Sequence, residues 1–179
     1  MNLKRPNTIA LLYITLLIST AALCQDLQDL SILAADASYG KEIIKLPVDW
    51  APNMNIEGFE ELRFSPGWGD LESPQFWSYV LAWDIKSTSA LSASEIEQNL
   101  EQYFDGLMKP NHWATAFPEP VVVLFPSEDK NTKQQFKGRM KYFDGFHTGK
   151  MMTTYILAEQ TFCATTQRAI VISRISPKL

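Results

Sequence analysis

The chain of 179 residues carries 16 Lys and Arg against 20 Asp and Glu, so its net charge at pH 7 is −4 and its isoelectric point is near 5.2. Nucleic-acid binding requires a basic surface that displaces counterions from phosphates, and this acidic composition argues against it. A chain of this length can bury a core of its own and needs neither metal nor disulfides to fold.

The first 24 residues have the layout of a secretory signal peptide. Two basic residues, Lys4 and Arg5, precede an apolar run from Ile9 to Leu23 that is short for a membrane span. We therefore expect residues 1–24 to be removed on export, leaving residues 25–179 as a single domain in the periplasm or outside the cell. No later apolar stretch approaches the roughly 20 residues of a transmembrane helix, so we expect no further span.

The sequence contains two cysteines, Cys24 and Cys163. A lipid anchor at Cys24 would require a small residue before it, and the bulky Leu23 favours cleavage without lipidation. Cys163 then lacks an intramolecular partner, and export without a disulfide framework favours a bacterial envelope protein. We interpret Cys163 as a small buried or half-buried residue near a turn, because no base that would activate its thiol stands near it in the sequence.

Alternating apolar residues predict three strands in the first half of the chain, at Lys41–Leu46, Glu60–Phe64 and Gln75–Ile85. In the third segment every odd position from Trp77 to Ile85 is apolar or aromatic. This strand is therefore predicted to have one heavily buried face and to lie centrally in a sheet.

One helix is predicted from Ser92 to Lys109. Ser92 and Glu95 have the spacing of a capping box, in which each side chain accepts a hydrogen bond from the other residue's backbone N–H. Apolar residues recur at three- and four-residue steps and form one stripe that needs a sheet to pack on: Ile96, Leu100, Tyr103, Phe104, Leu107 and Met108.

The C-terminal part predicts further strands, at Pro120–Phe125, Gln135–Phe143, Lys150–Glu159 and Gln167–Ser176. The order is strands, helix, strands. It predicts an α+β fold, in which an antiparallel β-sheet carries one amphipathic helix on one face.

The aromatic loop Ser65–Pro74 contains the leading candidate for ligand binding. Trp68 stands between two glycines in this loop, where partial exposure is expected, while Trp77 and Trp83 fit a core role. We therefore name Trp68, Asp70 and Trp50 as candidate ligand-binding residues.

No motif for catalysis is present. The sequence has no Gly-x-Ser-x-Gly motif and no phosphate-binding loop, and His147 with Asp144 lacks the spacing of a metal site. We therefore assign no catalytic residue, no metal and no cofactor. The alternative is a hydrolase that uses paired carboxylates, drawn from Asp70, Glu72 and Asp84.

Basic residues alternate along one predicted strand, at Lys137, Arg139 and Lys141. Such a stripe is usually a solvated face on which lysines discourage aggregation. It also fits contact with an anionic partner, such as an acidic protein, a lipid headgroup or an anionic polymer.

Several stretches carry a resemblance to exported bacterial proteins of unknown function: Leu46-Pro47, Trp50, Glu60–Trp68, Phe76–Tyr79, Trp83 and Ile175–Lys178. The resemblance implies a bacterial, exported protein and brings no activity or binding residue. We expect a non-enzymatic binding or interaction module of the bacterial envelope that contacts an envelope protein or ligand, with the hydrolase as the alternative.

Overall fold

A computed structural model describes residues 30–109, 118–127 and 134–178. The expected signal peptide at 1–24, with Cys24, lies outside the described residues. No helix within the described ranges has the length and apolar character that a membrane crossing requires.

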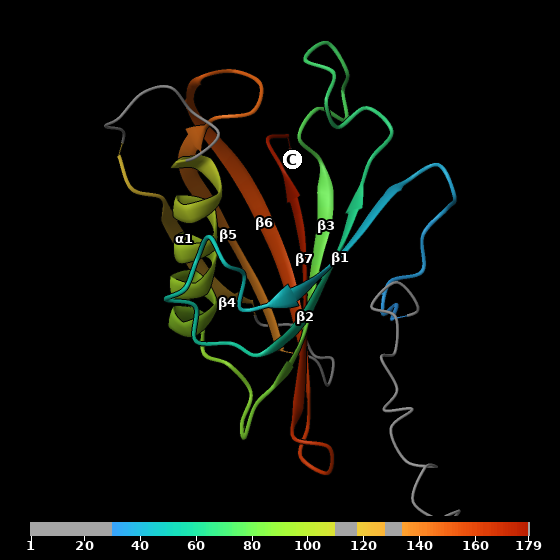
Figure 1. The fold of residues 1–179 in the computed structure, drawn as a ribbon, viewed down its shortest axis with the longest axis vertical. Helices are drawn as coiled ribbons and strands as arrows, with labels where there is room; N and C mark the ends of the chain where they lie inside the picture. The colour runs from blue at the N-terminus through green and yellow to red at the C-terminus, as the bar shows by residue number, and fades with distance from the viewer. Residues whose placement is uncertain (1–29, 110–117, 128–133, 179) are drawn as a thin grey trace, which may run out of the picture.

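The described residues form one seven-stranded sheet and one helix (Figure 1). All neighbouring strands are antiparallel, in the order β1-β2-β3-β7-β6-β5-β4. The helix packs against β4 and β5, so the α+β prediction is confirmed. The elements in chain order are β1 (Gly40–Leu46), β2 (Gly58–Phe64), β3 (Tyr79–Lys86), α1 (Ala93–Met108), β4 (Val121–Ser127), β5 (Gln134–Asp144), β6 (Lys150–Cys163) and β7 (Arg168–Ser176).

The helix α1 forms as its sequence predicts. Ser92 is the N-cap, its hydroxyl accepts the N–H of Glu95 at 3.2 Å, and the Glu95 carboxylate accepts the N–H of Ser92 at 2.7 Å. The predicted apolar stripe is buried against the sheet, apart from the partly buried Leu107. Asn99, a polar residue, is buried with the stripe, because it binds the loop that crosses the helix.

The outer edge of β4 is covered by α1. The backbone N–H of Val122 donates to the Glu101 carboxylate at 2.8 Å, and that of Leu124 donates to Glu97 at 2.6 Å. β4 is the last strand of the sheet, so no further strand accepts these hydrogen bonds. Because a free strand edge invites pairing with another chain, the two glutamates protect this edge.

Removing both acceptors should expose the edge of β4. We expect Glu97→Ala/Glu101→Ala to lower the free energy of unfolding by about 2 kcal/mol, since two hydrogen bonds to charged groups are lost and water replaces them only in part. Urea denaturation measures the loss, and sedimentation velocity should detect self-association. The Glu97→Gln/Glu101→Gln variant keeps both acceptor oxygens and serves as control. Equal stability of the two variants would contradict this role for the glutamates.

β3 is shorter than predicted. The sequence predicts a strand from Gln75, whereas β3 begins at Tyr79, and the preceding residues form turns. Trp77 has a φ of +55°, which an extended strand does not allow. Trp77 fits the apolar alternation of a strand because it is only 2% exposed, but its side chain reaches the core from a turn. The central position of the strand is confirmed, since β3 lies between β2 and β7.

One face of the sheet is apolar and buried at β5 and the other is basic and exposed, as the alternating sequence of this strand predicts. Its buried apolar set is Phe136, Met140 and Tyr142, and its exposed basic set is Lys137, Arg139 and Lys141. The buried set faces α1, since the rings of Phe104 and Tyr142 are 4.9 Å apart.

Cys163 is exposed, which corrects the prediction of a buried or half-buried thiol. It is the last residue of β6 and lies opposite Arg168 at the end of the hairpin, where few groups remain to cover it.

Candidate functional site

A pocket of about 520 Å³ lies between the C-terminal half of α1 and the β1–β3 part of the sheet. Its aromatic lining includes Trp50, Phe64, Trp68, Trp77, Tyr79 and Tyr103. These side chains come from two strands, the helix and the loops at 47–57 and 65–78. The volume lies in the range of pockets that hold small organic molecules, and the mostly apolar lining is typical of them.

The loop between β2 and β3 holds Trp68 and Trp77 together. The N–H of Trp77 donates to the carbonyl of Trp68 at 2.9 Å, and the two indoles stack with centroids 4.8 Å apart and 19° between their planes. The Ser65 hydroxyl closes the same loop by donating to the carbonyl of Gln75 at 3.0 Å. The positive φ of Trp77 costs on the order of 1 kcal/mol, and such strain concentrates at functional sites.

Trp50 reaches the pocket from the loop between β1 and β2, which lies across α1 (Figure 1). The N–H of Asn55 donates to the Asn99 side chain of α1 at 2.9 Å and anchors this loop. The carbonyl of Trp50 lies so close to Gly106 that a Cβ at this glycine would be 2.0 Å from its oxygen. The absence of a side chain at Gly106 therefore lets Trp50 pack edge-on against Tyr103, with ring centroids 5.9 Å apart.

Several polar atoms in and around the pocket wall lack a hydrogen-bond partner among the described residues. They include the indole N–H groups of Trp50, Trp68 and Trp77, the hydroxyl of Tyr142 and the Nε2 atom of His147. All are closed off from solvent. Buried polar groups are normally paired with protein or with ordered water, so these groups remain available to bound water or to a ligand.

Glu60 is buried behind Tyr103, one of the lining residues. Its side chain is 0% exposed, the Tyr103 hydroxyl donates to its Oε1 at 2.7 Å, and the indole N–H of Trp83 donates to its Oε2 at 3.1 Å. Burial raises the pKa of Glu60 to about 7; the two hydrogen bonds oppose this shift and the Glu42 carboxylate adds to it. Near neutral pH this carboxyl group is therefore protonated in a substantial fraction of molecules.

Glu42 is an exposed residue of β1 that lines the pocket. It stands opposite Leu62 in the pairing of β1 with β2. Burial raises the pKa of Tyr79 and of Tyr103 well above the ordinary value, and Glu60 acts in the same direction. Both phenols are therefore neutral at physiological pH, so Glu42 supplies the charge at the pocket.

The structure brings Trp50 and Trp68 together at one site, as part of the same lining. Asp70 is exposed on the Trp68 loop but does not belong to the lining, so its role in binding stays a prediction. Its carboxylate accepts the N–H of Glu72 at 3.0 Å and thereby caps a turn.

The three carboxylates of the hydrolase hypothesis do not converge on the pocket. Asp84 forms an ion pair with Arg168, with Nε and Oδ1 2.6 Å apart. Side chains alternate along β3, which places Asp84 on the opposite face from Tyr79 and the pocket. Asp70 and Glu72 are both exposed on the loop.

His147 packs against the aromatic cluster. Its ring meets Trp68 and Trp77 edge-on, with centroid distances of 4.9 and 5.2 Å. The Asp144 carboxylate instead accepts hydrogen bonds from the turn that follows it, including the N–H of Thr148 at 2.8 Å. Within the described ranges, no group of three or more His, Cys, Asp and Glu side chains could hold a metal ion.

The basic residues Lys137, Arg139 and Lys141 lie on the other face of the sheet, away from α1. Lys137 stands opposite Phe125 of β4 and Leu157 of β6, whose side chains are 62% and 51% exposed. The cations therefore alternate with exposed apolar groups across three strands. An anionic partner for this face stays a prediction.

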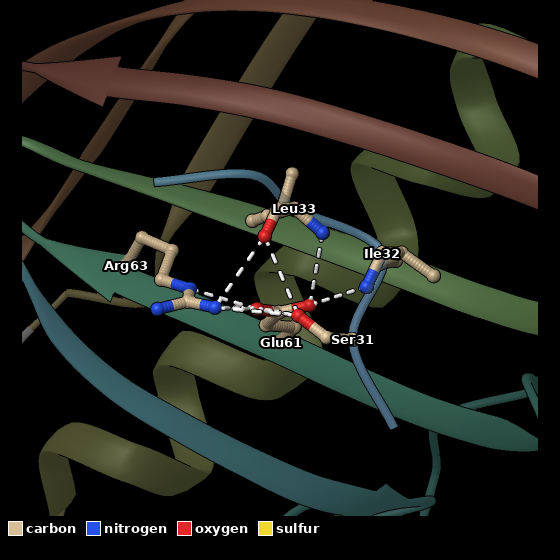
Figure 2. A network of polar contacts seen from close by, with 5 residues as sticks. All are labelled: Ser31, Ile32, Leu33, Glu61 and Arg63. Carbon is tan, nitrogen blue, oxygen red and sulfur yellow. Dashed lines mark hydrogen bonds and ion pairs between the residues drawn. The ribbon is translucent and has the colours of Figure 1, made fainter. Parts of the chain in front are cut away.

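On that same face, the chain before β1 is tied to β2 through Glu61 (Figure 2). The Glu61 carboxylate accepts the N–H groups of Ile32 and Leu33 at 2.6 and 3.1 Å and the Ser31 hydroxyl at 3.0 Å, and its Oε1 lies 2.6 Å from Nη2 of Arg63. Burial raises the pKa of Glu61, but these hydrogen bonds outweigh it and lower the pKa overall.

No protein-family model, curated protein or solved structure matches the chain.

Proposed function

We propose that the protein is a non-enzymatic binding module of the bacterial envelope that holds a small, largely apolar molecule in its aromatic pocket. The observation that carries this proposal is the pocket of about 520 Å³, whose wall is built from aromatic side chains of separate segments. The predicted signal peptide and the resemblance to exported bacterial proteins of unknown function support the proposed compartment.

Two features support binding of a small molecule over contact with a protein surface. Trp68 is only partly exposed and stacks on Trp77, so it forms a wall of the pocket rather than a projecting anchor. Two loops, 47–57 and 65–78, are held in place by hydrogen bonds to α1 and within the loop itself. A preformed wall binds a ligand without the entropic cost of ordering it.

Trp68→Ala should weaken binding of an apolar probe by at least about tenfold, because it removes a large aromatic contact from the wall. Nile red, a neutral apolar dye, reports binding through its fluorescence. Trp68→Phe should retain part of the affinity, and circular dichroism checks that both variants fold. Glu72→Gln, on the same loop and outside the lining, should bind like the native protein. Unchanged dye binding by a folded Trp68→Ala variant would show that the pocket is not the site.

The alternative, a carboxylate-dependent hydrolase, is now represented better by Glu42 and Glu60 than by the loop acids. A raised pKa beside a pocket is a feature of catalytic acids. Against this role, Glu60 is fully enclosed and both of its oxygens are already hydrogen-bonded. An enzyme would lose turnover in Glu60→Gln while ligand binding survived.

A further inference from the structure

We propose that the pocket selects ligands that carry an organic cation, such as a quaternary ammonium group, on an apolar body. This inference rests on the proposed function and names the chemical class of its ligand. It follows from the distribution of charge and of aromatic rings around the pocket.

The formal charge at the pocket is negative. Among the described residues that line it, Glu42 is the only one with a formal charge, and no Lys, Arg or His is part of the lining. Glu42 is exposed, so it lies at the side of the pocket that opens to solvent. A ligand carboxylate or phosphate would therefore enter without a cationic partner and close to a like charge, which disfavours it.

The aromatic wall favours the opposite charge. The face of an aromatic ring carries partial negative charge, so a cation within about 6 Å of the ring centre is attracted to it, most strongly by tryptophan. The lining supplies two partly exposed tryptophans, Trp50 and Trp68, which are backed by the buried rings of Trp77, Tyr79 and Tyr103. Quaternary ammonium groups suit such walls, because they are weakly hydrated and have no hydrogen-bond donors to satisfy.

A second carboxyl group reinforces this preference from behind the wall. Glu60 is held between Tyr103 and Trp83. It stands opposite Ile44, two residues along β1 from Glu42, so the two carboxyl groups lie on the same face of the sheet. A cation in the pocket would offset the repulsion between them. A bound anion would add to it.

Three probes with the same eight-carbon chain test the inference: octyltrimethylammonium, octanol and octanoate, titrated calorimetrically into the full chain at neutral pH. We expect the ammonium compound to bind about tenfold more tightly than octanol, and octanoate to bind most weakly. Glu42→Gln should bring the ammonium compound close to octanol. Glu72→Gln, which removes the same charge from the neighbouring loop outside the lining, should leave the preference intact.

Trp68→Ala separates binding in the pocket from adsorption on the acidic surface, because only the former should be lost. If octanoate bound as tightly as the ammonium compound, or if all three bound equally, the inference would be wrong while the proposed function stood. Full retention of the preference in Glu42→Gln would overturn the role of Glu42. If none of the three bound, the proposed function would fail with the inference.

Discussion

Between pH 4.5 and pH 8, Glu60→Gln should gain about 3 kcal/mol of unfolding free energy relative to the native protein. The pKa of Glu60 is raised from 4.5 to about 7 in the folded state, and each unit corresponds to about 1.4 kcal/mol. Between these two values the folded protein binds more protons than the unfolded chain, so its stability falls as pH rises. Glutamine mimics the neutral acid, because its carbonyl accepts the N–H of Trp83 and its amide donates to the Tyr103 hydroxyl.

Urea denaturation of both proteins between pH 4.5 and 8 measures this effect. Their difference in unfolding free energy isolates Glu60, since every other group titrates in both. Glu42→Gln is an informative control, because it removes a charge that raises the pKa of Glu60. The unfolding free energy of this variant should therefore fall less steeply with rising pH than that of the native protein. A difference between Glu60→Gln and the native protein that stays constant over this range would rule out the raised pKa.

Glu61→Ala should lower the free energy of unfolding by about 3 kcal/mol, because removing one partner of a buried ion pair leaves the other charge uncompensated. The side chain of Glu61 is fully buried, and that of Arg63 is only 12% exposed. The same change deprives the N–H groups of Ile32 and Leu33 of their acceptor. We therefore also expect residues 30–36 to detach from β2.

Chemical denaturation measures the global loss, and limited proteolysis within residues 30–36 detects the local release. The double variant Glu61→Ala/Arg63→Ala should be more stable than Glu61→Ala, since it removes the uncompensated cation. If the double variant were no more stable, the ion pair would not be the source of the effect. Because the pKa of Glu61 is lowered, its contribution is present above about pH 4.5 and is lost as the pH falls further.

The elements that sequence reasoning predicted well depend on neighbours along the chain. Ser92 and Glu95 are three residues apart, so the capping box that starts α1 could be recognised without knowledge of the fold. The alternation of β5 was equally clear, because one of its faces is buried and the other is exposed.

The pocket could be predicted only in part. Trp68 was a candidate because a tryptophan between two glycines is expected to be partly exposed, but nothing in the spacing of Trp50 and Trp68 places them beside one another. Glu60 and Glu42 were missed. A signal for Glu60 was present, since its position in β2 shares a face with Leu62 and Phe64, and an acid on an apolar strand face is unusual.

Local periodicity in the sequence therefore determined the fold class of this protein: several strands, one capped helix and a sheet whose two faces differ. The tertiary structure decided that Trp77 reaches the core from a turn, that Glu60 is enclosed and that Trp50, Trp68 and Tyr103 surround one cavity. The physical reason is the range of the interactions. Helix caps and strand alternation act over a few residues, whereas loop docking and desolvation depend on contacts between residues far apart in the chain, such as Asn55 with Asn99 and Glu60 with Tyr103.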